Sequence, residues 1–416
     1  MAGRPCPSRN AAPAPDTARP LRRTTGASFL PTTGGAQVSA PAAVTDILRG
    51  LRDTRGVARL SYFHCDHYEP WRWSADRPGI SEVNAEESIA FTEAMSRIPY
   101  ARRLTLFMKS PIQATLAGAH KSDALPGDEI GFHNIRRRQR LILTPAFEAI
   151  AGSGHELQVH LHHERFTRND WYSTSPERPE NLAFRAFMAE RSTPAMDSAR
   201  FAFYLERTLA LFRTVSGLPL DRWMFVHGMW SLNGSDRDYC CIDDELAIMA
   251  AQGCLGDFTF PAPRAHCNPA AAAPYLCRPV VAPKGYDHPD AAIEPATGQP
   301  ADGRFLIWST ATASALCSLD TTGRNFAALA ADPAGWAAQL LDGAVVHGDA
   351  VYLKTHAHSM MQQYFADPAN PAYPHAHPAV AAMFAALMDG CDASGIDFDP
   401  ITASEAYDRF VAPAAP

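Results

Sequence analysis

The sequence predicts an α/β protein in which a parallel sheet is covered by helices and is either open or closed into a barrel. Segments with strand character and segments with helical periodicity alternate about seven times along the chain. The strand segments are short and almost continuously apolar, as in parallel sheets that are buried on both faces. Ionisable side chains come at the carboxyl ends of these strands, and parallel α/β sheets bind their ligands at that edge.

The composition narrows the class of protein. The chain has 416 residues, of which 46% are hydrophobic and 19% are charged, and its formal net charge is -7. These values predict a globular protein with a large core, and the negative charge argues against nucleic acid as the main partner. No apolar run of the sequence reaches the length of a membrane span. Nine cysteines without a CxxC pair indicate reduced thiols in a cytoplasmic protein.

The amino-terminal segment differs from the rest of the chain. Residues 1–42 are rich in Arg, Ala and Pro, and we expect a disordered tail because such a segment cannot bury enough apolar surface to fold. Arg22 and Arg23 resemble a twin-arginine export signal only weakly, since no apolar segment follows, and export stays an alternative to the cytoplasm. Residues 43–416 are expected to form one catalytic domain, with insertions near 111–140 and 262–303.

The apolar periodicity places each element in turn. After a helix at 43–52, strands are expected at 60–66, 103–110, 156–162, 222–228, 255–261, 304–310 and 351–358. Helices are expected between them at 85–98, 145–151, 198–215, 243–251 and 334–341. Thr402 and Glu405 form a capping-box pattern that predicts a last helix, and the segment PHAHP at 374–378 is expected to be a surface loop.

Polar side chains recur at the ends of the expected strands, often two residues apart, so that they share one face of the strand. The residues at these ends are His64 and Asp66, His160 and His162, His227, and finally Lys354, His356 and His358. Imidazole and carboxylate are ligands for a divalent cation, most often zinc, with cobalt, nickel, manganese and iron as alternatives. We therefore predict a metal held by Asp66, His160 and His162, with His64 as an alternative ligand, and a metal-bound water as nucleophile.

The segment GHELQVHLHHE (154–164) resembles the second motif of the polysaccharide deacetylase superfamily, in which a strand-end histidine binds the metal. His160 takes that position. A second ligand histidine usually follows four residues later, where this chain has Glu164, so that His162 is the substitute. In the first motif of that superfamily, Asp66 matches the metal-binding aspartate, and Cys65 stands where the family has an aspartate that acts as base. The segments HYEPW, FVHGMWSLNGSD and YLKTHAH look like those of a divergent bacterial branch of the same superfamily.

The resemblance implies a distorted seven-stranded (β/α) barrel of the polysaccharide deacetylase and glycoside hydrolase type. It also implies a hydrolase that removes an acyl group, such as N-acetyl, from a carbohydrate. Because Cys65 is a poor base, His67 or Glu69 is expected to take the proton of the water, and His356 or His358 to protonate the leaving amine. The residues expected to bind the substrate are Trp71, His227, Trp230, Asn233 and Lys354.

Two other functions stay open at this point. A glycoside hydrolase would need two carboxyl groups about 5–10 Å apart on either side of the bond, and Asp66, Glu69 and Asp257 are its candidates. A non-catalytic relative that binds a sugar or a metal is the other alternative, since the acid and base motifs of the superfamily are changed in this chain.

Overall fold

The computed structural model describes most of the predicted domain. The described residues are 40–71, 80–111, 137–161, 198–216, 220, 222–230, 232–234, 242–262, 269, 271–282, 286, 291–292, 305–321, 324–361 and 373–411. Almost all of the predicted amino-terminal tail, His162, and the segments 112–136 and 362–372 therefore lie outside the described residues.

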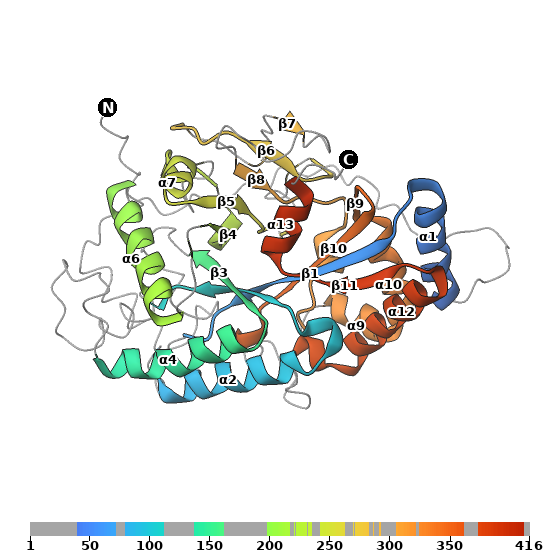
Figure 1. Ribbon diagram of the computed structural model, residues 1–416, viewed down its shortest axis with the longest axis horizontal. Helices are drawn as coiled ribbons and strands as arrows, with labels where there is room; N and C mark the ends of the chain where they lie inside the picture. Colours follow the sequence, from blue (N-terminus) through green and yellow to red (C-terminus); the bar gives the residue numbers. More distant parts are fainter. Residues whose placement is uncertain are drawn as a thin grey trace, which may run out of the picture.

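One curled sheet forms the centre of the fold (Figure 1). Its strands are β1 (Arg59–Tyr68), β2 (Thr105–Lys109), β3 (Glu156–Leu161), β4 (Trp223–His227), β5 (Cys254–Asp257), β6 (Tyr275–Cys277), β7 (Ala291–Ala292), β8 (Phe305–Ile307), β9 (Val345–His347), β10 (Ala350–Ala357) and β11 (Asp397–Pro400). The pairing is parallel from β8 through β5, β4, β3, β2 and β1 to β10. Antiparallel strands extend both ends of this run, β6 and β7 beyond β8 and β9 beyond β10, while β11 pairs with the first half of β1.

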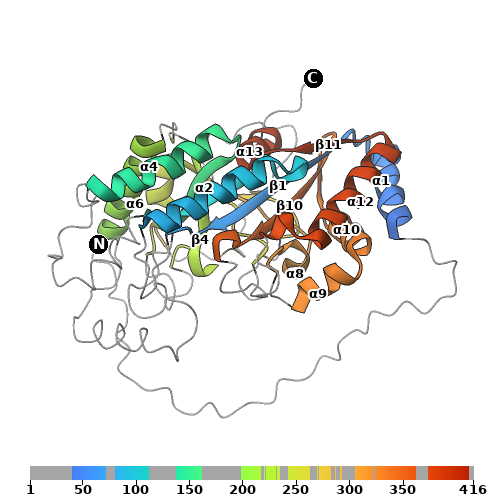
Figure 2. The same cartoon turned by 90° about the horizontal axis from the view of Figure 1, so that it is seen from below.

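Helices cover the outer face of the sheet, and the last one along the chain packs against the inner face. They are α1 (Ala40–Arg55), α2 (Glu82–Ser96), α4 (Arg137–Gly152), α6 (Ser198–Ser216), α7 (Glu245–Ala251), α8 (Ser314–Cys317), α9 (Arg324–Ala331), α10 (Pro333–Asp342), α12 (Pro378–Ser394) and α13 (Ala403–Val411), with 3-10 turns η1 (Pro99–Ala101), η3 (Gly228–Trp230), η5 (Ser359–Met361) and η6 (Pro374–Ala376). Figures 1 and 2 show α2, α4 and α6 on one side of the molecule and α1, α10 and α12 on the other. None of the described helices combines the length and apolarity required of a membrane span.

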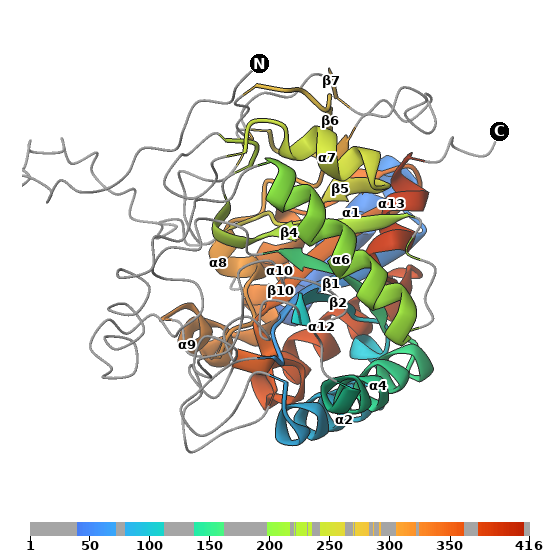
Figure 3. The ribbon, with the colours of Figure 1, turned by 90° about the vertical axis from the view of Figure 1, so that its left-hand side faces the viewer.

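The sheet separates two hydrophobic cores. The inner core lies within the curl of the sheet and includes Phe63, Phe107 and Trp308 together with residues of α13. The outer core lies between the sheet and the helices, and α1, α2, α4, α6, α10 and α12 all contribute to it. Because both faces of the strands are buried, the strands are apolar on both sides, as the sequence indicates. In the side view of Figure 3, helices α2, α4 and α6 of the outer layer lie beside the strands.

Helix α13 closes the inner core at the amino ends of β2 and β3. Ala403 N donates to Thr105 Oγ1 (2.7 Å) and Ser404 N donates to Glu156 Oε2 (3.2 Å), so two strand side chains satisfy N–H groups in the first turn of the helix. Further along the helix, the ring of Phe410 packs against Trp308. The carboxyl ends of the parallel strands therefore lie at the end of the inner core that α13 leaves uncovered.

The predicted α/β class and the parallel sheet are confirmed, and so is the last helix. Glu405 N donates to Thr402 Oγ1 (3.3 Å) and Thr402 N donates to Glu405 Oε2 (2.8 Å), which is the reciprocal bonding of a capping box. The segment that follows β8 is joined to β10 by a single isolated β-bridge among the described residues, between Ser318 and His356. The sheet is thus a curled half-barrel, and its closure into a seven-stranded barrel stays a prediction.

Several elements differ from those expected. The segment 262–303 carries β6 and β7 where a loop was expected, and α12, β9 and β11 were not predicted. Helix α4 begins at Arg137, so the expected insertion at 111–140 ends inside a helix. The prediction of a surface loop at 374–378 was wrong, because His375 is fully buried within η6 and the His377 side chain caps α12 by accepting from Ala379 N.

Replacing Phe410 by Ala should lower the free energy of unfolding by about 3 kcal/mol, because it removes an aromatic ring from a closed core. The ring lies 5.3 Å from that of Trp308 and 5.8 Å from that of Tyr352, centre to centre. Chemical denaturation measures the change, with Val83→Ala, a residue with 43% of its surface exposed, as the control. A loss below about 1 kcal/mol would show that α13 does not close the inner core.

Candidate functional site

Strand β1 divides its polar residues between the two faces of the sheet. Phe63 and Cys65 belong to the inner core, whereas Tyr62 and Tyr68 belong to the outer core. Since successive side chains point to opposite faces, His67 lies on the inner face and His64 and Asp66 lie on the outer face. The predicted pairing of His64 with Asp66 on one face is therefore correct, but that face is covered by helices.

The outer face holds a buried polar network around Asp66. Ser359 donates to the Asp66 carboxyl through both its backbone N–H and its hydroxyl, and His64 Nε2 lies 3.2 Å from Asp66 Oδ2. His64 Nδ1 is bonded to the hydroxyl of Thr355 (2.8 Å), which also contacts Tyr62. Burial raises the pKa of the Asp66 carboxyl to about 7 and lowers the pKa of His64 to about 3.

The metal site predicted from the sequence is not assembled by the described residues. In the register of the sheet, His160 pairs with Lys109 and Val226 on the inner face, the face opposite to that of Asp66. His162 lies outside the described residues, so one of the three predicted ligands cannot be placed. Among the residues that the structure describes, no three His, Cys, Asp or Glu side chains are grouped so as to hold a metal ion.

Four histidines meet on the inner face at the carboxyl ends of the strands, and we name them the histidine cluster: His67, His160, His356 and His358. The ring centre of His67 lies 4.6 Å from that of His358, 5.1 Å from that of His160 and 6.0 Å from that of His356. Burial, together with the charge of the neighbouring histidines, holds the pKa of His67 well below its ordinary value. His67 is consequently neutral at neutral pH and lies at the centre of the cluster.

Glu69 and Lys109 complete the inner face beside His160. Glu69 Oε2 accepts a hydrogen bond from Lys109 Nζ at 2.8 Å, and Glu69 Oε1 lies 3.5 Å from His160 Nε2. His160 Nδ1 donates to the carbonyl oxygen of Val226 (2.9 Å), so the proton of the neutral ring is on Nδ1 and Nε2 faces the carboxylate. The carboxylate of Glu69 is thus bonded to Lys109 and lies next to His160 on the neighbouring strand.

His358 is the member of the cluster that carries a charge. Its Nδ1 is 2.9 Å from Asp320 Oδ2, and its backbone N–H donates to Asp320 Oδ1 (2.7 Å). Burial opposes protonation of this ring, but the Asp320 carboxylate outweighs burial and raises the pKa of His358 to about 9. By contrast, burial lowers the pKa of His356 to about 3. The cluster therefore places an imidazolium next to neutral imidazoles.

Three of the five residues expected to bind substrate make contacts within the fold instead. Trp71 is buried in the outer core, where its Nε1 donates to Met108 Sδ. His227 lies on the outer face with Nε2 3.0 Å from Glu245 Oε1 of α7. Lys354 is on the inner face, but its Nζ donates to the carbonyl oxygens of Phe258 and Phe260, so it ties β10 to the end of β5.

Asn233 stabilises the turn after β4. Its Oδ1 accepts from Leu246 N (3.0 Å) and its Nδ2 donates to the carbonyl oxygens of Val280 and Ala282 (3.3 and 2.6 Å). Asn233 and Trp230 both have a positive φ, 48° and 57° respectively. This backbone conformation is strained for a bulky residue such as Trp, so it has to be stabilised by the surrounding contacts. Trp230 is half-buried and packs against the outer core. The amide of Asn233 therefore holds a strained turn instead of lining a substrate pocket.

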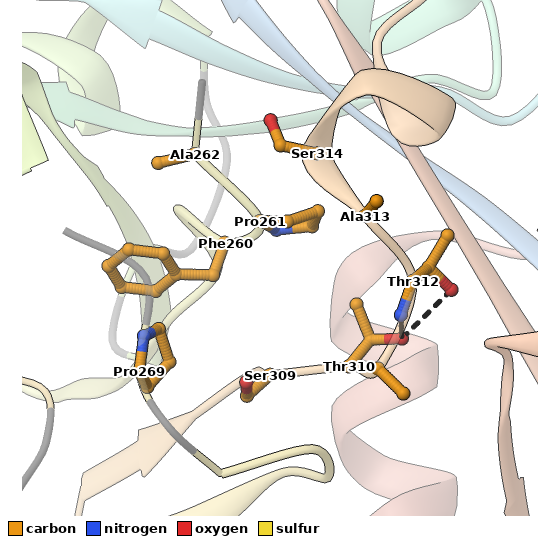
Figure 4. Close-up of a pocket in the computed structure, with 10 residues that line it drawn as sticks. Phe260, Pro261, Ala262, Pro269, Ser309, Thr310, Thr312, Ala313 and Ser314 are labelled. Atoms are coloured by element: carbon orange, nitrogen blue, oxygen red, sulfur yellow. Dashed lines mark hydrogen bonds between the residues drawn. The ribbon is translucent and has the colours of Figure 1, made fainter. Parts of the chain in front are cut away.

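A cavity of about 370 Å³ lies at the carboxyl ends of β5 and β8. Figure 4 shows Phe260, Pro261 and Ala262 facing the segment from Ser309 to Ser314, which contributes four hydroxyl groups. Among the described residues that line this cavity, none is charged. Lys354 of β10 donates to the carbonyl oxygen of Phe260, one of the lining residues, but no residue of the histidine cluster lines the cavity.

Lys109 and Asp320 were not among the residues predicted from the sequence. Lys109 ends the second strand, at the position where the other strands carry histidine, and this shared position was the available signal. Asp320 follows an irregular segment after β8 and reaches His358 only through the fold, so no local pattern reveals it. Cys65, which was judged a poor base, is buried in the inner core, and burial raises the pKa of its thiol to about 12.

Comparisons with known proteins leave the family of this chain open. No protein-family model, no curated protein and no solved structure matches it. The resemblance to the polysaccharide deacetylase superfamily accordingly rests on the motifs of the sequence.

Replacing Asn233 by Ala should lower the free energy of unfolding by about 2 kcal/mol, since it removes the acceptor for Leu246 N at the start of α7 and leaves the carbonyl oxygens of Val280 and Ala282 without their donor. Thermal and chemical denaturation measure the loss, with Thr54→Ala on the exposed face of α1 as the control. Unchanged stability combined with a weakened KM would instead return Asn233 to the substrate pocket.

Replacing Asp320 by Asn should lower the pKa of His358 from about 9 to below neutrality, because the carboxylate that opposes the effect of burial is removed. Histidine-labelled protein followed by NMR across the pH range gives the midpoint for each ring. The same titration of Asp349→Asn, an exposed carboxyl bound to Arg59, should leave His358 unchanged. A His358 midpoint that stays near 9 in Asp320→Asn would assign the charge to another partner.

Proposed function

We propose that this protein is a hydrolase that removes an acyl group, such as N-acetyl, from a carbohydrate at the carboxyl ends of β1, β2, β3 and β10. The observation that carries the proposal is the contact between a protonated and a neutral imidazole, His358 and His67, whose ring centres are 4.6 Å apart. Neighbouring groups with pKa values pushed apart are the usual arrangement of a catalytic acid and its base. Both rings lie on the inner face, at the edge where parallel α/β sheets carry their active sites.

Two features support a carbohydrate as substrate. The sequence motifs around Asp66, His160 and His356 resemble those of the polysaccharide deacetylase superfamily, whose distorted seven-stranded barrel is the proposed form of the complete sheet. The cavity at the carboxyl ends of β5 and β8 combines hydroxyl groups with an aromatic ring and prolines, and none of the described lining residues is charged. Hydroxyl groups and apolar ring faces are also what an uncharged sugar presents, so the two surfaces are complementary.

The reaction can be written with the residues of the histidine cluster. A water adds to the acyl carbon while neutral His67 takes one of its protons, and the π electrons of the carbonyl move onto its oxygen. The intermediate then collapses, the carbon–nitrogen bond breaks, and His358 gives its proton from Nε2 to the leaving nitrogen. A proton passed from His67 to His358 restores both rings, and the products are a carboxylic acid and an amine.

Two of the three metal ligands expected from the sequence, Asp66 and His160, are not brought together by the described residues. Asp66 and His160 lie on opposite faces of the sheet, and the Asp66 carboxyl is already bonded to Ser359 and His64. The proposed reaction therefore uses side chains alone.

The described cysteines are free and buried, which supports the predicted location in the reducing cytoplasm.

A glycoside hydrolase has less support, because each of its three candidate carboxyl groups is already bonded within the fold. Glu69 accepts from Lys109, Asp66 accepts from Ser359, and Asp257 accepts from Thr259 and Tyr286. Two carboxyl groups on either side of one bond are what that reaction requires.

Replacing His358 by Gln should lower kcat for release of acetate from an N-acetylated oligosaccharide by about 100-fold or more, because the proton donor to the leaving amine is lost. In the parent protein, release should fall as the pH rises through about 9, since the deprotonated ring cannot act as the acid.

Acetate measured by NMR gives both results, and His347→Gln, on β9 and away from the cluster, is the matched control. An inactive parent protein that is nonetheless stabilised by the sugar against heat would identify a binding protein. New reducing ends without acetate would favour the glycoside hydrolase.

A further inference from the structure

Lys109 occupies a central position among the charged groups of the inner face. It is the last residue of β2, and it pairs in register with His160 on β3, while Glu69 directly follows β1 on the other side. Its ammonium group lies 2.8 Å from Glu69 Oε2, and the same carboxylate lies 3.5 Å from His160. The positive charge of Lys109 on β2 thus lies between β1 and β3, which contribute His67 and His160 to the histidine cluster.

The pair of Lys109 and Glu69 is largely withdrawn from water. The side chains are 13% and 10% exposed, respectively. In such surroundings a fixed charge acts on a nearby dipole far more strongly than it does in water. An ammonium group held by a carboxylate in a dry site is one of the arrangements that stabilise negative charge developing on a carbonyl oxygen.

The same ammonium group opposes a divalent cation at this place. Glu69 and His160 are potential metal donors that lie 3.5 Å apart on the inner face, and a cation bound to them would lie beside Lys109. Like charges at such a separation in a buried site repel strongly. Lys354, the other described lysine, is bonded to the carbonyl oxygens of Phe258 and Phe260 and ties two strands together.

We propose that Lys109 supplies the positive charge that a divalent metal supplies in the enzymes this chain resembles, polarising the acyl carbonyl and stabilising its oxyanion. This proposal rests on the proposed acyl hydrolysis and adds to it that the reaction needs no metal. Glu69 then acts as a positioning residue, because its carboxylate holds the ammonium group on the inner face. The base and the acid remain His67 and His358.

The test uses the full chain, purified without added metal. Elemental mass spectrometry should find well below one metal per chain, zinc should not raise the Tm, and acetate release should be unchanged after treatment with a chelator. Lys109→Met should lose about 100-fold or more in kcat, as expected for removal of an oxyanion-stabilising group. Its Tm should also fall, because the Glu69 carboxylate loses its partner, so kcat is compared at a temperature where both proteins are folded. Lys109→Arg should keep more of the activity than Lys109→Met, because it keeps the charge, and Arg97→Met, an exposed charge on the outer surface, should behave as the parent.

The outcomes separate this proposal from the proposed function. About one metal per chain, with activity that the chelator abolishes and zinc restores, would overturn the role of Lys109 and leave the hydrolase standing. Full activity in Lys109→Met would likewise overturn the role of Lys109 and leave the hydrolase standing. A parent protein that is folded and metal-free but releases no acyl group from any sugar would overturn the proposed function and, with it, the role of Lys109.

Discussion

The alternation of side chains along β1 between two closed cores is the constraint on which the rest of the site depends. A strand buried on both faces must satisfy its polar groups on each face separately, because water reaches neither core freely. On the outer face, His64 and Asp66 are satisfied by Thr355 and Ser359. On the inner face, His67 meets the other histidines. Shifting the pairing of β1 by one residue would exchange the two sets and remove the histidine cluster.

Two carboxylates of the inner face each have a cation as partner. Glu69 is bonded to Lys109 and Asp320 to His358. A buried charge without a partner is costly, and these pairs allow charged groups to lie next to neutral imidazoles with little penalty. In the proposed hydrolysis, these pairs and the neutral imidazole of His67 would supply an acid, a base and a fixed positive charge before any substrate arrives, which is a form of preorganisation. Helix α13 contributes indirectly, because it closes the amino end of the same core.

Most elements of the fold could be predicted from the sequence, and the failures have local causes. The strands of the parallel run are apolar and bounded by polar turns, so each was found within a few residues. Helix α12 was not predicted, since Pro378 was taken as part of a loop although proline is favoured in the first turn of a helix. The short strands β6, β9 and β11 carry too few residues for a periodic pattern and exist only because a neighbouring strand pairs with them.

The sequence by itself determined which residues of one strand share a face, since that depends only on the two-residue repeat of an extended chain. It therefore paired His64 with Asp66 correctly, and it placed the polar groups at the carboxyl ends of the strands. The tertiary structure decided which face is the inner one, because strands that are apolar on both sides carry no pattern that distinguishes the faces. It also brought Lys109 next to Glu69 and Asp320 next to His358. These contacts join residues 40 and 38 positions apart, and only the register of the sheet and the path of the chain after β8 create them.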